Sequence, residues 1–414
     1  MFTSFSTALS ALNAMSTGID VVGNNLANLD TTGFKASTVS FYDLVTQSIG
    51  AGLGSTQVGF GVGSPVTSRE FTQGSTQTTG GPLDAAIQGD GFFIVQDPSG
   101  GTQFTRSGSL QVDTAGDLIT ATGDKVQGWT AANGVLNTNG PVSNITLPVG
   151  DVKAPQATSN FSVDLNLNSA ATAGPPPDSF STGVQVYDSL GGAHTVTATF
   201  TKAAAAGTWN YSISVPDADV TSPFTPVTGT VVFDSNGNLT TPSPTDTPPQ
   251  VKIQGLADGA SDLTLNWQLY NGQAPRLTQY AQPSESSANA QDGFAPAQLD
   301  SVGIANGGQI VAKYSNGQQS VVGQLAMATI RNPESLLAVG NSNFQTSSQT
   351  ALPAIGVPGT GGRGTILGGA LESSTVDIAR EFTNLIVLQR GYEANAKVVT
   401  TVDQLSQDTI NLKT

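Results

Sequence analysis

The sequence predicts a mainly β protein whose two ends form long α-helices. Three observations lead to this fold class. Apolar residues recur with a spacing of seven over the first 30 residues, a helical apolar period fills 372–414, and short β-forming runs between turns occupy the middle. The 48 Gly and 22 Pro among 414 residues favour frequent turns. We expect the middle to form inserted domains resembling a β-barrel or β-sandwich.

The amino-terminal helix is expected over residues 1–30. Asp20 is the only charged residue before residue 30, so this helix is poorly suited to full exposure in water. Its large apolar residues recur every seven positions and form a seam: Phe5, Leu12, Ile19 and Leu26.

The carboxyl-terminal helix is expected within 372–414. Ser373 and Ser374 precede Asp377, where a helix cap and a first-turn acid belong. Its apolar seam recurs every three or four residues and includes Ile378, Phe382, Leu385, Tyr392 and Val399.

Two helices with narrow seams bury little surface by themselves. We therefore expect the terminal helices to pair as a coiled coil in an assembled polymer, in which these seams mediate polymerisation. The same seams also suit core helices of an ordinary globular domain, and the low charge of 1–29 favours assembly.

The middle of the chain contains runs of β-forming residues at 91–95, 184–187, 194–200, 211–215 and 263–267. Proline-rich stretches lie inside a central region that resembles a unit of its own. The expected division has four parts: a terminal helical domain (1–30 with 372–414), a connecting extended or hairpin region (31–70 with 358–371), a β domain (71–145 with 288–357) and an inserted β domain (146–287).

Composition excludes several classes of function. The net charge of −15 repels nucleic acid and anionic lipid, so neither is an expected partner. The absence of cysteine excludes disulfides and thiolate metal sites. No stretch is long and apolar enough to insert in a membrane, and 1–30 lacks the features of a cleaved secretory signal.

No catalytic, cofactor-binding or metal site is expected, and the sequence predicts that the protein is not an enzyme. The only histidine, His194, lies in an alternating strand without a nucleophile at a justifiable spacing. The segment from Asp234 to Asn238 has oxygen ligands typical of a calcium loop but lacks the closing glutamate, which favours a hairpin turn. The glycines around Gly89 and those at 359–369 favour turns and a linker over phosphate loops.

Motifs at both ends resemble the bacterial flagellar rod and hook protein family. DVVGNNLAN at 20–28 and TTGFK at 31–35 resemble its amino-terminal signature, and GALESS at 369–374 with EFTNLIVLQRGYEANAK at 381–397 resembles its terminal helix. GDGFF at 89–93 and FTRSG at 104–108 are similar to its shared β domain, while KYSNGQ at 313–318 and VGN at 339–341 resemble hook subunits. The motif residues carried over are Asn24, Asn25, Asn28, Gly33, Phe34, Lys35, Gly89 and Gly91.

This resemblance implies a structural subunit of the flagellar hook. Such a subunit self-assembles into a flexible helical tube, a universal joint that transmits torque from motor and rod to filament. The implied partners are further copies of the chain, the distal rod protein, the hook cap, the hook–filament junction proteins and the type III export apparatus. The implied location is extracellular, in the hook and basal body, after export without a cleaved signal peptide.

Other functions remain open at this level. A distal rod protein of the same family shares the terminal motifs, although it would lack most of the central insertion. A secreted β-rich adhesin or binding module suits the Gly- and Thr-rich centre but leaves both ends unexplained. A cell-wall hydrolase requires a carboxylate pair or metal ligands that the sequence does not reveal.

Overall fold

The computed structural model describes residues 2–44, 46–49, 56–131 and 135–411. The chain divides into two compact units. Unit 1 comprises Met1–Val149, Ser301–Lys313 and Gln319–Thr414, and unit 2 comprises Gly150–Asp300 and Tyr314–Gln318. Unit 2 continues past residue 287, the expected end of the inserted domain, because β25 (Glu285–Gln291) pairs with β14 (Asn160–Asn166).

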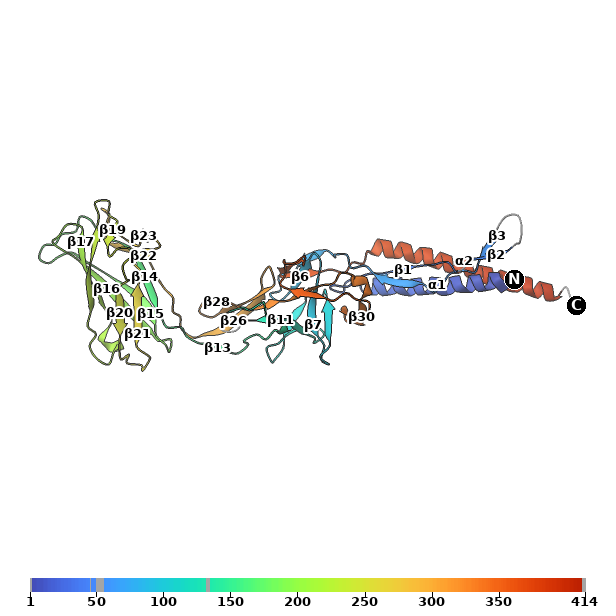
Figure 1. Ribbon diagram of the computed structural model, residues 1–414, viewed down its shortest axis with the longest axis horizontal. Helices are drawn as coiled ribbons and strands as arrows, with labels where there is room; N and C mark the ends of the chain where they lie inside the picture. The colour runs from blue at the N-terminus through green and yellow to red at the C-terminus, as the bar shows by residue number, and fades with distance from the viewer. Residues whose placement is uncertain (1, 45, 50–55, 132–134, 412–414) are drawn as a thin grey trace. The chain divides into compact units, whose positions relative to one another are not determined.

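Two long helices, α1 (Phe2–Ala27) and α2 (Ile378–Asn411), bring the ends of the chain together in unit 1 (Figure 1). They run side by side in opposite directions. A Cβ added at Gly18 would lie 3.0 Å from Leu388, and one at Gly391 would lie 3.2 Å from Met15. The helices therefore approach closely where one of them has no side chain. In the described part of the chain, neither helix is long and apolar enough to cross a membrane.

The first turn of α2 is capped by Asp377. Its Oδ1 accepts hydrogen bonds from the backbone N–H groups of Ala379 at 2.8 Å and Arg380 at 3.1 Å. The expectation that Ser373 or Ser374 would cap this helix is therefore wrong. Both serines lie too far ahead of the first helical residue, Ile378, for their hydroxyls to reach its free N–H groups.

The rest of unit 1 consists of short strands in one large sheet and several two-stranded ribbons. The large sheet follows the order β26-β27-β28-β11-β7-β8-β31-β30 within this unit, with β9, β10, β12, β29 and β32 attached to its sides. Its strands are β7 (Phe92–Gln96), β8 (Thr102–Thr105), β9 (Leu110–Val112), β10 (Leu118–Thr120), β11 (Lys125–Thr130), β12 (Ser143–Asn144), β26 (Ala297–Ile304), β27 (Gln309–Tyr314), β28 (Gln319–Leu325), β29 (Met327–Thr329), β30 (Leu337–Gly340), β31 (Asn343–Gln345) and β32 (Ala354–Gly356). The ribbons pair β1 (Ser37–Ser40) with β4 (Val66–Arg69), β2 (Thr46–Ile49) with β3 (Thr56–Gly59), β5 (Thr76–Thr78) with β34 (Ala370–Glu372), and β6 (Ala85–Gln88) with β33 (Thr365–Gly368). A short 3-10 helix, η2 (Pro333–Ser335), precedes β30.

An aromatic core holds the sheet of unit 1 together. Phe344 is fully buried, and the ring of Phe71 meets Phe92 and Phe344 edge-to-face with centroids 5.5 and 5.1 Å away. Trp129 is buried in the same cluster, and its indole N–H donates to the Gly140 carbonyl at 2.8 Å. Each of these rings is contributed by a different segment, so the core joins strands that are distant in the sequence.

Unit 2 contains two five-stranded sheets around one apolar core. One sheet has the order β20-β21-β14-β24, with β25 also paired to β14, and the other has the order β15-β16-β17-β18-β19. Trp267 lies between them, stacked on Phe161 at 6.2 Å and in edge contact with Tyr211 at 5.1 Å. The elements are β13 (Val152–Lys153), β15 (Ser179–Tyr187), β16 (Ala193–Lys202), β17 (Thr208–Ser214), η1 (Asp217–Asp219), β18 (Val227–Phe233), β19 (Leu239–Thr241), β20 (Gln250–Ile253), β21 (Leu263–Trp267), β22 (Tyr270–Asn271), β23 (Ala274–Pro275) and β24 (Leu277–Thr278).

Aspartate-capped turns close several hairpins. Asp234 Oδ1 accepts hydrogen bonds from the N–H groups of Asn236 at 2.9 Å and Asn238 at 2.8 Å, and Gly237 adopts the required positive φ of 80°. The segment proposed as either a calcium loop or a hairpin turn is thus the turn between β18 and β19. In their own turns, Asp97, Asp113 and Asp188 likewise accept hydrogen bonds from the backbone N–H groups two and four residues further along the chain.

Acid should weaken these turns. The backbone N–H groups of Asn238 and Asn236 lower the pKa of Asp234 below its ordinary value of 3.8. Because the folded-state pKa is lowered, the stabilisation is complete above about pH 4 and is lost as the pH falls through the folded-state value. Urea unfolding of the chain between pH 5 and pH 2 should therefore show a shallower loss of stability in Asp234→Asn than in the unmodified chain. Asp151→Asn, at an exposed position, serves as the control, and identical slopes for the two variants would contradict this prediction.

Candidate functional site

Three segments of unit 1 that are far apart in the sequence meet at one buried carboxylate. Lys35 Nζ donates to Glu372 Oε1 at 2.7 Å, and Arg106 Nη1 donates to Glu372 Oε2 at 3.3 Å. The Lys35 and Glu372 side chains are completely buried, and the Arg106 side chain is 3% exposed. We call these three residues the Glu372 cluster. It joins the segment after α1, the loop after β8 and the last residue of β34.

Most of the charged groups in the Glu372 cluster have additional polar partners. Lys35 Nζ also donates to the Thr72 carbonyl at 2.6 Å, and the Gly74 N–H donates to Glu372 Oε1 at 2.8 Å. Burial lowers the pKa of Lys35, and the Glu372 carboxylate opposes that change. Two cations surround one anion, so the carboxylate is what makes burial of both cations tolerable.

Glycines allow the backbone to close around this cluster. Gly33 has a φ of 68°, its N–H donates to the Glu372 carbonyl at 2.9 Å, and an added Cβ would lie 2.6 Å from the Arg106 carbonyl carbon. Gly89 offers its carbonyl to Arg106 Nη2 at 3.0 Å. At Gly91 the φ is 136°, and an added Cβ would lie 2.6 Å from Met327 Cε. At Gly33 both the positive φ and the neighbouring backbone exclude a Cβ, whereas at Gly91 the positive φ is the reason for a glycine.

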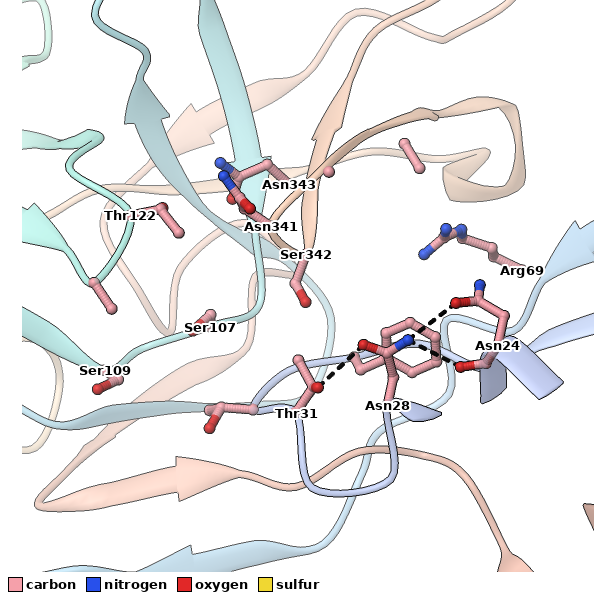
Figure 2. A pocket seen from close by; sticks show the side chains of 15 residues that line it. Asn24, Asn28, Thr31, Arg69, Ser107, Ser109, Thr122, Asn341, Ser342 and Asn343 are labelled. Atoms are coloured by element: carbon pink, nitrogen blue, oxygen red, sulfur yellow. Dashed lines mark hydrogen bonds between the residues drawn. The ribbon is translucent and has the colours of Figure 1, made fainter. Parts of the chain in front are cut away.

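The asparagines of the amino-terminal motif fasten the end of α1 to the β ribbon. Asn25 is buried; its side-chain amide donates to the Ser37 carbonyl at 2.8 Å and its Oδ1 accepts from the Ser37 N–H at 3.0 Å. Asn28 donates to both the carbonyl and the side-chain oxygen of Asn24 and accepts from the Thr31 hydroxyl at 3.1 Å (Figure 2). These bonds fix the turn that leads from the helix to β1.

A pocket of about 580 Å³, lined by polar and apolar residues, opens beside Asn24 and Asn28 (Figure 2). Arg69 lies on one side, with its guanidinium 5.8 Å from the centre of the Phe34 ring, and burial lowers its pKa. Asn341 and Ser342, at the tip of the β30–β31 hairpin, line another side and have positive φ angles of 54° and 58°. The pocket offers amide, hydroxyl and guanidinium donors, a combination that suits a carbonyl-rich or acidic segment of another molecule.

The expected polymerisation residues of the terminal helices lie at different depths. Phe5, Ile378, Phe382 and Tyr392 are exposed, whereas Leu12, Ile19, Leu26, Leu385 and Val399 are half-buried. The buried side of α1 is instead a stripe of mostly small residues. The members of this stripe are Ala8, Ala11, Ala14, Gly18, Val22 and Asn25. The seam of large residues thus differs from the stripe that α1 buries within one molecule.

The sequence predicted no role for Glu372, Arg106 or Arg69, although Glu372 lies in the motif at 369–374 and Arg106 in the motif at 104–108. A single charged residue in a short segment does not alter the periodic pattern from which strands and helices are predicted. Its ionic partners lie far away in the sequence and become neighbours only in the folded chain. The small-residue stripe of α1 could have been found from the spacing of Ala8, Ala11 and Gly18, which is that of one helix face.

Comparisons with known proteins cover the whole chain. Models of four protein families match consecutive parts of it: "Flagella basal body rod protein" at 5–35, "Flagellar hook protein FlgE/F/G D1 domain" at 86–166, "Flagellar basal body protein FlaE D2 domain" at 166–294 and "Flagellar basal body rod FlgEFG protein C-terminal" at 367–412. The flagellar hook protein FlgE of Escherichia coli (strain K12) is 32% identical over 420 residues, covering 99% of this chain and 100% of that protein.

The chain belongs to the flagellar hook protein family. The hook proteins FlgE of Salmonella typhimurium and Treponema pallidum are 33% and 32% identical, and each match covers at least 99% of this chain and 100% of the relative. The crystal structure of the Helicobacter pylori hook protein FlgE2 shares the fold, with a TM-score of 0.53 and 14% identity over 72% of this chain and 100% of that one. The family resemblance inferred from the terminal motifs is confirmed.

Proposed function

We propose that this chain is the structural subunit of a flagellar hook and that it polymerises through the outer faces of α1 and α2. The observation that carries the proposal is the number of large apolar side chains left exposed on both helices. These are Phe5, Leu9, Ile378, Phe382, Ile386, Val387, Tyr392, Val398, Leu405 and Ile410, each between 42% and 65% exposed. Such surfaces are favourable only when another molecule covers them.

The paired helices form the repeating element of the proposed polymer. On α1 five of the six buried residues, Ala8, Ala11, Gly18, Val22 and Asn25, fit a heptad spacing, as expected for an antiparallel coiled coil with a close approach, and Ala14 is the exception. This pairing uses the small-residue stripe inside each subunit and leaves the large residues for contacts between subunits. Family membership supports placing these helices on the inside of a helical tube.

The β-rich parts are proposed to form the outer layers of the tube. The two sheets of unit 2 enclose one core in the manner of a sandwich. In the proposed tube this unit is assigned to the outermost layer. The four-part division suggested by the sequence remains a proposal within this scheme. The tube would act as a universal joint that transmits torque between rod and filament, a mechanical role that requires no catalysis.

The hook assignment brings further proposals about partners and location. The subunit would contact its own copies, the distal rod protein, the hook cap and the hook–filament junction proteins. It would reach the extracellular face through the flagellar export apparatus without loss of a signal peptide. The negative net charge of −15 is consistent with the absence of nucleic acid from this set.

A charge placed on the outer face of α2 should prevent polymerisation. Leu405 is 53% exposed, so Leu405→Asp should leave the thermal midpoint of the monomer nearly unchanged, whereas burial of an unpaired carboxylate between subunits costs several kcal/mol. We expect the critical concentration for polymer formation to rise by at least about a hundredfold. Sedimentation and electron microscopy of the concentrated protein measure this change.

The neighbouring variant Gln404→Asp is the matched control, because Gln404 is exposed and already polar. It should polymerise at nearly the normal concentration. Normal tubes from Leu405→Asp would overturn the proposed interface, and failure of the unmodified chain to form long polymers would favour the secreted binding module. Straight, rigid polymers without curvature would favour the distal rod protein.

A further inference from the structure

One end of unit 2 gathers the only histidine of the chain with three carboxylates. His194 Nε2 lies 2.7 Å from Asp188 Oδ2 and 3.8 Å from Asp258 Oδ2, and His194 Nδ1 lies 3.3 Å from Asp219 Oδ2. Asp188 is fully buried and His194 is 7% exposed, whereas the Asp258 side chain is 38% exposed. The cluster is therefore closed on the protein side and open to solvent at Asp258.

In Asp188 and Asp258, one carboxylate oxygen accepts hydrogen bonds from the backbone of its own loop, and the second oxygen faces the imidazole of His194. Asp188 Oδ1 accepts the N–H groups of Leu190 at 2.7 Å and Gly192 at 2.9 Å, and Asp258 Oδ1 accepts the N–H of Ala260 at 3.0 Å. Both Oδ2 atoms are thereby directed toward His194 Nε2. A Cβ at Gly192 would lie 2.9 Å from Asp258 Oδ2 and would also press on Asp188 Oδ2, so a glycine is needed for this convergence.

Backbone and side-chain bonds hold the contributing loops in place independently of the cluster. Asp188 and His194 flank the turn between β15 and β16, and Asp258 belongs to the loop between β20 and β21 of the other sheet. The Ala257 N–H donates to the Asp219 carbonyl at 3.0 Å, and the Ser261 N–H donates to the Ser189 hydroxyl at 3.0 Å. The donor atoms are thus positioned in advance.

We propose that His194 Nε2, Asp188 Oδ2 and Asp258 Oδ2 bind a divalent first-row transition metal ion, for which Zn²⁺ is the probe. These three atoms lie within 4.8 Å of one another. Bonds of about 2.0 Å at tetrahedral angles place ligand atoms about 3.3 Å apart, and the separations of 2.7 and 3.8 Å from Nε2 lie on either side of that value. Water completes the coordination from the exposed side.

Asp219 acts as a positioning residue for the metal site. Its Oδ2 lies 3.3 Å from the buried Nδ1, on the side away from the metal, without a hydrogen bond between them. A small rotation of the imidazole on metal binding would complete the carboxylate–histidine–metal arrangement of many zinc sites. A proton on Nδ1 leaves the Nε2 lone pair for the metal. One imidazole with two carboxylates suits zinc and its first-row neighbours better than Mg²⁺ or Ca²⁺, which prefer oxygen ligands alone. The bound ion would join the two sheets of unit 2.

A purely ionic cluster is the competing explanation. Burial by itself lowers the pKa of His194, but the carboxylates of Asp188 and Asp219 outweigh it and raise that pKa, so a proton can occupy the centre when metal is absent. In that case Nε2–H donates to Asp188 and no metal binds. The two explanations differ in what Zn²⁺ does to the histidine ring.

Zinc titration of the full chain, kept below its polymerisation concentration and freed of metal by a chelator, tests the proposal. Calorimetry should give one Zn²⁺ per chain. Because there is a single histidine, the imidazole nitrogen resonances report on His194 alone, and Nε2 should shift as a metal-bound nitrogen. Substitution of Co²⁺ for Zn²⁺ should give visible absorption typical of nitrogen and oxygen ligands. The thermal midpoint of unit 2 should rise with Zn²⁺ concentration.

Three variants make the test specific. Asp258→Asn removes an exposed ligand without breaking the His194–Asp188 contact, and should weaken Zn²⁺ binding by at least about tenfold. Asp219→Asn should weaken it by about 10- to 100-fold while Nε2 remains the ligand. Asp217→Asn, on the same short helix as Asp219 but exposed and outside the cluster, should bind normally. No binding, unchanged imidazole resonances, or equal affinity in Asp217→Asn and Asp258→Asn would each overturn the proposal.

Discussion

Replacing Glu372 with glutamine should destabilise unit 1 by about 3–5 kcal/mol, because it leaves two buried cations without their counter-ion. Lys35 and Glu372 are both completely buried, so water cannot substitute for the lost carboxylate. Glutamine has nearly the same shape, which limits the change to charge. Calorimetry of the monomer should show the transition of unit 1 at a lower temperature while that of unit 2 stays in place.

Glu70→Gln provides the control for this experiment. The Glu70 carboxylate is 37% exposed and lies 3.7 Å from Arg380, and loose surface pairs of this kind contribute less than about 1 kcal/mol. Adding Lys35→Met to Glu372→Gln should recover part of the lost stability, since only Arg106 then remains unpaired. A loss in Glu372→Gln no larger than in Glu70→Gln would show that the Glu372 cluster does not hold unit 1 together.

Gly33→Ala should also be strongly destabilising, by about 3 kcal/mol or more. A positive φ of 68° already disfavours any residue with a Cβ, and that Cβ would lie 2.6 Å from both the Arg106 carbonyl carbon and the Ser107 nitrogen. A clash with backbone atoms cannot be relieved by a change of rotamer, as a clash with the end of a side chain can. Relief of the strain would require either the Arg106–Ser107 backbone or the buried neighbours Phe34 and Lys35 to move. Urea unfolding of the monomer measures the loss.

Gly23→Ala is the matched control and should change stability in the opposite direction. Gly23 lies in α1, and a Cβ there would have nothing within 4 Å. Alanine in place of an exposed helical glycine stabilises by about 0.5–1 kcal/mol. Equal effects of the two substitutions, in sign or in size, would contradict the structural role assigned to Gly33.

The coarse fold was accessible from local sequence patterns. The five predicted β-forming runs overlap β7, β15, β16, β17 and β21, because alternation of β-forming residues records which face of a strand is buried. The helical ends were expected at 1–30 and 372–414, and α1 and α2 lie within those bounds. Strand alternation and helical periodicity both depend only on residues that are close in sequence, so they can be recognised from one sequence alone.

The site residues were harder to predict, for two physical reasons. A hydropathy pattern is dominated by large apolar side chains such as Phe5. The stripe that α1 buries instead contains Ala11 and Gly18, whose small size allows the two helices to approach closely. The Glu372 cluster depends on contacts between residues hundreds of positions apart. His194 and its three carboxylates come from three separate places in the chain, the β15–β16 turn, η1 and the β20–β21 loop, and no local pattern relates Asp219 or Asp258 to the histidine.

The pairing of Lys35 with Glu372 also determines when unit 1 can finish folding. The two residues are separated by 337 positions, so the ammonium group has no counter-ion until nearly the whole chain has been synthesised. Closure of such a long loop is slow and entropically costly before its contacts form. Most of unit 2 is contiguous, from 150 to 300, and can reach its native topology while the carboxyl-terminal residues are still being added. An incomplete chain thus holds a folded β unit between segments that remain in a non-native state until the last hundred residues arrive.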